Sequence, residues 1–277
     1  MSQIVSFCRQ LSFSGSLSDS LILLSSSSMI VDDSIFNDLN VNNLVVSSSS
    51  SIKLNHLSIT EVTANTVFQL DQSNSVMNNL IMFSVFSKDF VYSTFSTISL
   101  NTVEVDQSIS TVWFSLINCK LHMQNLNFSK THGDVFSVLN STDSSLSMVL
   151  VENSNLSFFL NILNSELSIN SLSLFNCTGS ILESSVNSSI TTQNLAITDS
   201  IFDTLFLLSD SSLSLSLGNI GLSSFNNSTL VLYNSTLEVE EVTIDMVSTS
   251  IFLESIESNS TFENIVIRNY EFLQFWF

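Results

Sequence analysis

The sequence predicts an all-β protein folded as a parallel β-helix of about twelve coils. Three observations predict it: apolar residues that recur about every 23 positions, alternation of apolar and polar residues within each repeat, and a composition unfavourable to helices. Of 277 residues, 44% are hydrophobic and 60 are serine, and there is no proline. Serine favours turns, and β-branched and aromatic residues favour strands. A disordered chain would lack this much apolar mass.

The repeat is anchored on an apolar pair, Leu57 and Ile59, which recurs in steps of 23 residues. The other pairs, in chain order, are Leu11 and Phe13, Ser34 and Phe36, Leu80 and Met82, Val103 and Val105, Leu126 and Phe128, Val149 and Val151, Leu172 and Leu174, and Leu195 and Ile197. Past Ile197 the register is expected to shift slightly, to Ile220 and Leu222, Val242 and Ile244, then Ile265 and Ile267.

A second apolar column follows each anchor by about ten residues and confirms the period. Its members are Leu21, Leu44, Val67, Phe90, Trp113, Phe136, Phe159, Leu182, Leu205, Leu230, Phe252 and Phe275. Because this column mixes aromatic with aliphatic residues, we expect Phe90, Trp113, Phe136 and Phe159 to stack in the interior rather than form an outer sugar-binding ridge.

Alternation with a period of two predicts short strands with one face inward, and polar corners separate them. Successive coils would stack at about 4.8 Å and form one solenoid over residues 1–277. An asparagine precedes the anchor in five repeats, so a partial ladder of side-chain amides is expected between coils. These asparagines are Asn79, Asn125, Asn194, Asn219 and Asn264.

The alternative fold is a leucine-rich-repeat solenoid, because "LNHLSI" and "INSLSL" also fit its L-x-x-L-x-L pattern. That repeat expects asparagine or an equivalent three residues after the last apolar position. The chain instead has residues such as Val62, Val85 and Thr131 there. The second half of each repeat also lacks helical spacing, which favours the β-helix.

The segments "LNFSKTHGDVFSVLNS" and "LSLFNCTGSILESS", with Gly133 and Gly179, carry a family likeness. They resemble the repeats of polymorphic outer-membrane and autotransporter-like proteins and the Ser/Asn-rich ectodomain repeats of ciliates and other protists. The resemblance implies a right-handed β-helix of the pectate-lyase-like superfamily, located at the cell surface or outside the cell. It implies no particular ligand.

The charge of the chain excludes several classes of partner. The formal net charge is −19, and the six basic residues are scattered, so no basic stripe exists to bind nucleic acid or anionic membranes. No apolar run approaches the ~18 residues of a membrane span, and the N-terminus has no signal-peptide pattern. Cys8, Cys119 and Cys177 are too few and too widely spaced for a disulfide scaffold.

No set of residues specifies a reaction, so we expect no catalytic, cofactor or metal site and no enzyme. The acidic groups, Glu238, Glu240, Glu241 and Asp245 in one coil and Asp32, Asp33 and Asp38 in another, are interpreted as solvated patches, because no acidic column continues into neighbouring coils. Cys119, His122, His132 and Asp134 fall in one repeat but on different faces, which disfavours zinc. His56 is expected to stand alone and exposed, and Cys177 to be a buried filler rather than a nucleophile.

Nine N-x-S/T sequons are candidate glycosylation sites, although the composition alone would produce about as many. They are Asn127, Asn140, Asn155, Asn176, Asn187, Asn226, Asn227, Asn234 and Asn259.

The sequence therefore favours a structural or adhesive β-helix segment of a cell-surface or secreted protein, with other surface proteins or glycans as partners. A polysaccharide-binding or polysaccharide-cleaving β-helix is the alternative, and a protein-binding leucine-rich repeat is the third. The apolar C-terminus, with Phe272, Phe275, Trp276 and Phe277, resembles an uncapped coil. It predicts a fragment of a longer array that associates end to end.

Overall fold

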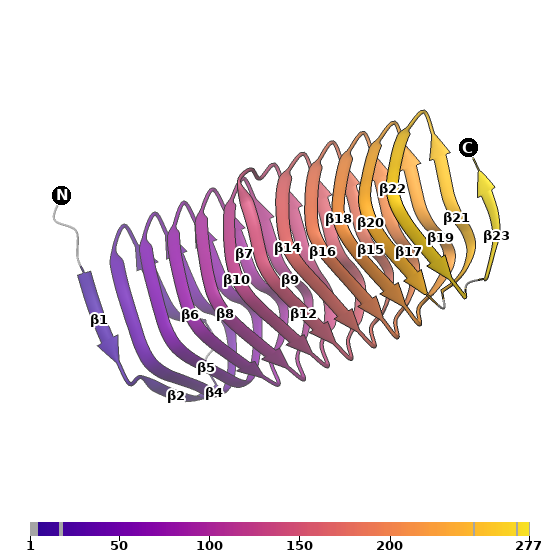
Figure 1. Ribbon diagram of the computed structural model, residues 1–277. Helices are drawn as coiled ribbons and strands as arrows, with labels where there is room; N and C mark the ends of the chain where they lie inside the picture. Colours follow the sequence, from indigo (N-terminus) through magenta and orange to yellow (C-terminus); the bar gives the residue numbers. More distant parts are fainter. Residues whose placement is uncertain (1–4, 17–18, 246, 270, 277) are drawn as a thin grey trace.

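The chain forms a right-handed parallel β-helix of about 11 turns, close to the twelve coils that the repeats predict (Figure 1). The computed structural model describes residues 5–16, 19–245, 247–269 and 271–276. Among these residues there are 23 strands and no helix, and the strands pair only in parallel. The side chains of Phe272, Phe275 and Trp276, and all of Phe277, lie outside the described part.

The first two dozen residues contribute three short strands, and the next two coils are single long strands. These are β1 (Val5–Arg9), β2 (Ser12–Ser16), β3 (Ser20–Ser25), β4 (Ser28–Ser48) and β5 (Ser51–Asp71). β4 pairs with β1, β2 and β3 on one side and with β5 on the other.

From β6 onward each coil consists of two strands, and every strand pairs with the second strand after it. The even-numbered half contains β6 (Asn74–Phe83), β8 (Thr97–Asp106), β10 (Lys120–Ser129), β12 (Ser144–Glu152), β14 (Glu166–Phe175), β16 (Ser189–Thr198), β18 (Ser212–Gly221), β20 (Thr236–Asp245) and β22 (Asn259–Arg268). The odd-numbered half contains β7 (Phe86–Thr94), β9 (Ile109–Ile117), β11 (His132–Leu139), β13 (Asn155–Leu163), β15 (Thr178–Val186), β17 (Ile201–Ser209), β19 (Ser224–Tyr233), β21 (Ser248–Ile256) and β23 (Glu271–Trp276).

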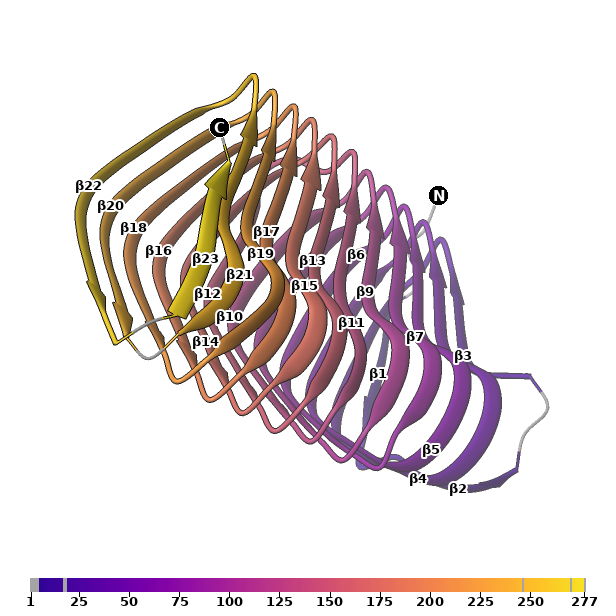
Figure 2. The same ribbon diagram turned by 90° about the vertical axis from the view of Figure 1, so that its right-hand side faces the viewer.

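Figure 2 shows that successive coils repeat one outline, with the two halves joined by a tight turn at each end. Because both halves of the coil are strands, the leucine-rich-repeat alternative is wrong.

The predicted apolar columns line a single continuous core. Leu57 and Ile59 are 2% and 0% exposed, and Phe90, Trp113, Phe136 and Phe159 are at most 1% exposed, so the interior stack is confirmed. Neighbouring rings contact one another along the axis, as between Phe90 and Trp113, whose centroids are 5.8 Å apart. Such contacts add to the burial free energy that holds the coils together.

The structure corrects the predicted register in four places, one of which is Phe275, which pairs with Leu253 rather than Phe252. Leu195 and Ile197 pair with Gly218 and Ile220, so the 23-residue step continues, and Leu222 is a turn residue that is 52% exposed. Phe136 pairs with Phe114 and Leu160, one column away from its predicted place. Leu230 is displaced in the same way and pairs with Phe206 and Leu253.

Serine and cysteine side chains join the coils at the turn after β4 and at the turns after the odd-numbered strands from β5 to β19. The first residue of each such turn has a positive φ, as in Asn187 (φ 49°), and the next side chain is buried. Ser188 Oγ donates to the carbonyl of Val186 at 2.7 Å and accepts the backbone N–H of Ser165, one coil back, at 3.2 Å. The buried members of this column, here named the serine ladder, are Ser50, Ser73, Ser96, Cys119, Ser141, Ser165, Ser188, Ser211 and Ser235.

A less regular ladder follows the even-numbered strands. Its buried polar members are Ser108, Thr131, Ser154, Cys177, Ser200 and Ser223. The backbone N–H of Cys177, for example, donates to Ser200 Oγ at 3.1 Å. Each ladder satisfies backbone groups that the tight turns would otherwise leave buried and unpaired.

Candidate functional site

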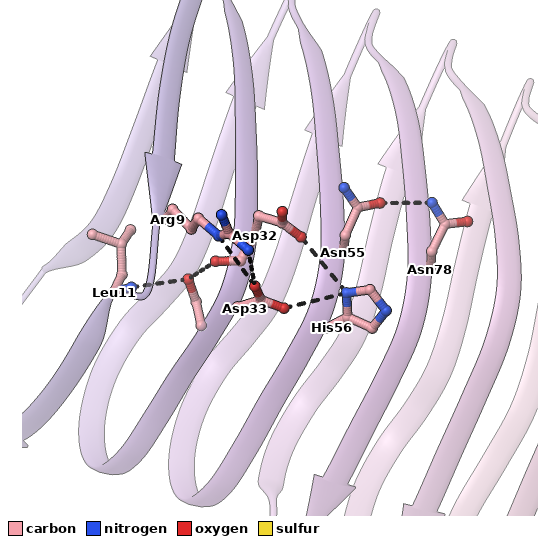
Figure 3. A network of polar contacts seen from close by, with 8 residues as sticks. Arg9, Leu11, Asp32, Asp33, Asn55, His56 and Asn78 are labelled. Atoms are coloured by element: carbon pink, nitrogen blue, oxygen red, sulfur yellow. Dashed lines mark hydrogen bonds and ion pairs between the residues drawn. The ribbon is translucent and has the colours of Figure 1, made fainter.

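Four charged or titratable side chains meet at the corner of the first three coils (Figure 3). Arg9 ends β1, Asp32 and Asp33 lie in β4, and His56 lies in β5. Arg9 pairs in register with Asp32, and His56 follows Asp33 by one 23-residue step. The stacking of coils therefore brings together residues that are far apart in the sequence, and the expectation that His56 stands alone is wrong.

The imidazole of His56 lies between the two carboxylates. Its Nδ1 is 3.6 Å from Asp32 Oδ1 and 3.4 Å from Asp33 Oδ1. The guanidinium of Arg9 binds the other oxygen of Asp33, with Nη2 and Nε at 3.2 and 3.3 Å from Oδ2. His56 is 60% exposed and Asp32 24%, so the cluster is open to solvent but rooted in the coil.

Backbone conformation fixes the direction of these side chains. Asp33 and His56 both have positive φ, 48° and 51°, at equivalent positions of adjacent coils. Ser34, which follows Asp33, is buried and donates to the carbonyl of Asp32 at 2.9 Å while accepting the N–H of Leu11 at 3.1 Å. The corner is therefore held by hydrogen bonds beneath the exposed cluster.

An amide ladder continues along this corner, but not at the predicted asparagines. Asn78 donates to Asn55 at 2.7 Å (Figure 3). Asn101 in turn donates to Asn78 at 2.8 Å. The predicted members are not stacked on one another: Asn125, for example, pairs with Thr102 and Met148.

The acidic patch on β20 extends into the next coil. Glu238, Glu240 and Glu241 are exposed, as expected, but Glu240 and Glu241 line a shallow hollow together with Glu263 from the next coil. Sequence inspection missed Glu263, although it follows Glu240 by the repeat length of 23. The hollow also contains the amides of Asn194 and Asn264.

The potential zinc ligands of the sixth repeat, Cys119, His122, His132 and Asp134, do not form a group of converging ligand atoms. Among the described residues, the only group of three potential ligand atoms within 4.8 Å of one another is Asp32, Asp33 and His56. His122 is exposed and its Nδ1 lies 3.0 Å from Ser145 Oγ, whereas Cys119 is buried in the serine ladder.

Burial raises the pKa of two side chains, Cys177 and Glu183. Cys177 is 0% exposed, and burial raises the pKa of its thiol, so it is a filler of the second ladder, as expected. Glu183 on β15 is 2% exposed, and burial raises the pKa of its carboxyl to about 8. It occupies an apolar column between Leu160 and Phe206, which sequence patterning did not reveal.

All nine sequon asparagines are exposed, so each side chain is accessible to modification. Asn140, Asn187 and Asn234 lie at the turn that carries the serine ladder, at positions with positive φ.

Comparison of the chain with protein-family models, curated proteins and solved structures finds no match. In the part of the chain that the structure describes, no helix has the length and apolar character needed to cross a membrane.

Proposed function

We propose that the chain is a rigid β-helix segment of a cell-surface or secreted protein, acting as a spacer or a display surface. The observation that carries the proposal is the continuous stack of about 11 parallel turns around one core. The serine ladder links successive coils from Ser50 to Ser235, and the second ladder adds links from Ser108 to Ser223, which makes bending of the stack costly. The resemblance of the repeats to those of surface proteins of the pectate-lyase-like superfamily supports the same function.

Location on intact cells tests this proposal. An antibody raised against the folded segment should label living, unpermeabilised cells of the source organism or its culture medium. Labelling that appears only after permeabilisation would contradict a surface or secreted role. An antibody against a cytosolic protein of the same cells, applied in parallel, reports whether the membrane is intact.

Binding of a neutral polysaccharide is the second candidate, because shallow hollows follow one corner of the coils. One is lined by Gln124, Asn125 and Asn170, and another by Gln193 and Asn194, whose amides can pair with sugar hydroxyls. A glycan array probed with the purified chain tests this candidate. Binding that is lost in Asn125→Ala and Asn194→Ala would favour a carbohydrate-binding function over a passive spacer.

A further inference from the structure

We infer that Asp32, Asp33 and His56 form a binding site for a divalent transition-metal ion of the Zn²⁺ class. The ligand set is one imidazole nitrogen and two carboxylate oxygens, contributed by two adjacent coils. This inference contradicts the sequence-based expectation that the chain lacks a metal site, and it does not depend on the proposed spacer function.

The separation of the ligand atoms fits a shared ion better than direct hydrogen bonds. His56 Nδ1 is 3.4 and 3.6 Å from the two Oδ1 atoms, whereas N–H···O hydrogen bonds are about 2.7–3.2 Å long. Ligands bound to Zn²⁺ at about 2.1 Å in tetrahedral geometry lie about 3.4 Å from one another. The two nitrogen–oxygen distances already have this spacing, and all three ligand atoms lie within 4.8 Å of one another, so an ion can enter with little rearrangement.

Arg9 orients the site without occupying it. Its guanidinium contacts Oδ2 of Asp33, which leaves Oδ1 directed toward His56 (Figure 3). Hydrogen bonds from a neighbouring group commonly fix a metal-bound carboxylate in this way. With Arg9 counted and a neutral imidazole, two carboxylates still leave the site a net negative charge for a cation.

The surroundings allow an ion to reach the site and complete its coordination. Asp33 is 39% exposed and His56 60%, so solvent approaches the ligands from outside the coil. Three protein ligands with an open position for water are a common arrangement for zinc. The nitrogen ligand and the small number of oxygens favour Zn²⁺ over Ca²⁺, which requires six to eight oxygens.

The chain contains a matched control, because it has three histidines and, among the described residues, only His56 contacts a pair of carboxylates. The experiment is calorimetric titration of the metal-free full chain with Zn²⁺, for wild type, His56→Gln, Asp33→Asn and His132→Gln. His132 is an exposed histidine on β11, outside the cluster. Circular dichroism of each variant verifies that it is folded.

We expect one Zn²⁺ per chain in the wild type and in His132→Gln. Affinity should fall at least about tenfold in His56→Gln and in Asp33→Asn, because each loses one of three ligands. Ca²⁺ and Mg²⁺ should bind at least about tenfold more weakly than Zn²⁺. Absence of Zn²⁺ binding in the wild type, or equal affinity of wild type and His56→Gln, would overturn the inference.

Discussion

Among the described residues, Glu183 is the only aspartate, glutamate, lysine or arginine that is buried. Its Oε1 atom has no hydrogen-bond partner there, and both register neighbours, Leu160 and Phe206, are apolar. A carboxylate without a partner is costly to bury, so the folded protein holds this group protonated.

This burial predicts a loss of stability as the pH rises. The pKa of Glu183 is raised from 4.5 to about 8, so between these values the unfolded chain releases a proton that the folded chain retains. The free energy of unfolding should therefore fall by about 1.4 kcal/mol per pH unit across this window, and level off above it. Urea denaturation at a series of pH values measures this slope.

Two variants identify the group responsible for this slope. Glu183→Gln should abolish the fall of about 1.4 kcal/mol per pH unit in the free energy of unfolding, because glutamine does not titrate. Glu166→Gln, which changes an exposed carboxyl on β14, should retain it. If Glu183→Gln keeps the wild-type slope, Glu183 is not the cause.

Gly133 is required by backbone conformation, and its replacement should be among the most damaging single changes. Its φ is +121°, and a Cβ at this position would collide with the carbonyl oxygen of Ser110 in the coil below. Gly133→Ala should lower the free energy of unfolding by about 3 kcal/mol or more. Gly221→Ala is the control, because its Cβ would be 3.8 Å from the nearest atom, and it should change stability by less than about 1 kcal/mol. Equal urea midpoints for the two variants would contradict this assignment.

The metal-ligand cluster shows what residue-level inspection of the sequence missed. Asp33 and His56 are separated by 23 residues, the repeat length, and this separation predicts that they lie in adjacent coils. The repeat reveals this contact only when unlike side chains, a carboxylate and an imidazole, are paired across adjacent coils. The burial of Glu183 could not be predicted for another reason. A polar residue in a strand is usually exposed, and the alternation of apolar and polar residues does not distinguish an exposed glutamate from a buried one.

At the scale of the elements, the serine ladder should contribute measurably to stability. Ser188→Ala removes an acceptor for the N–H of Ser165 and leaves that donor buried and unpaired, which costs about 1–3 kcal/mol. Ser168→Ala, at an exposed position of β14, should change stability by no more than about 0.5 kcal/mol. Urea denaturation of both variants compares them directly, and equal stabilities would show that the ladder is dispensable.

The strands, their inward faces and the repeat length could be predicted from the sequence, whereas local changes in register could not. The coil that contains Gly133 is one residue short, so Phe114 pairs with Phe136, 22 residues later. Two consecutive residues are buried at this position of the coil, as with Val135 and Phe136. Either residue fits the apolar column, so the pattern alone does not reveal that the register shifts by one residue.

The serine ladder could be predicted only in part, because the sequence does not show which serine of each turn is buried. Corners rich in serine were predicted, but adjacent serines have opposite environments, as in the turn where Ser49 is exposed and Ser50 is buried. Composition does not distinguish the serine that pairs with backbone from the one that faces water.

On the scale of the whole molecule, each coil contacts only its neighbours, so protection from hydrogen exchange should vary along the axis. The inward residues Phe262, Ile265 and Ile267 of β22 are only partly buried, whereas Ile169, Leu172 and Leu174 of β14 are buried. Backbone amides of β22 should therefore exchange faster than those of β14. Exchange measured by mass spectrometry on peptides from the two strands tests this, and uniform exchange would indicate all-or-none opening of the whole helix.

The core and the buried ladders hold the coils together beneath the outward side chains. The surface of the molecule therefore presents regularly spaced positions that can vary independently. Along one outward column, Lys53, Val76, Ser99, His122 and Ser145 follow one another at intervals of one coil. Nothing in the core or the ladders depends on which of these residues is present. Evolution, or a protein engineer, can therefore set the chemistry of each position independently, spaced by about 4.8 Å, without altering the fold beneath it.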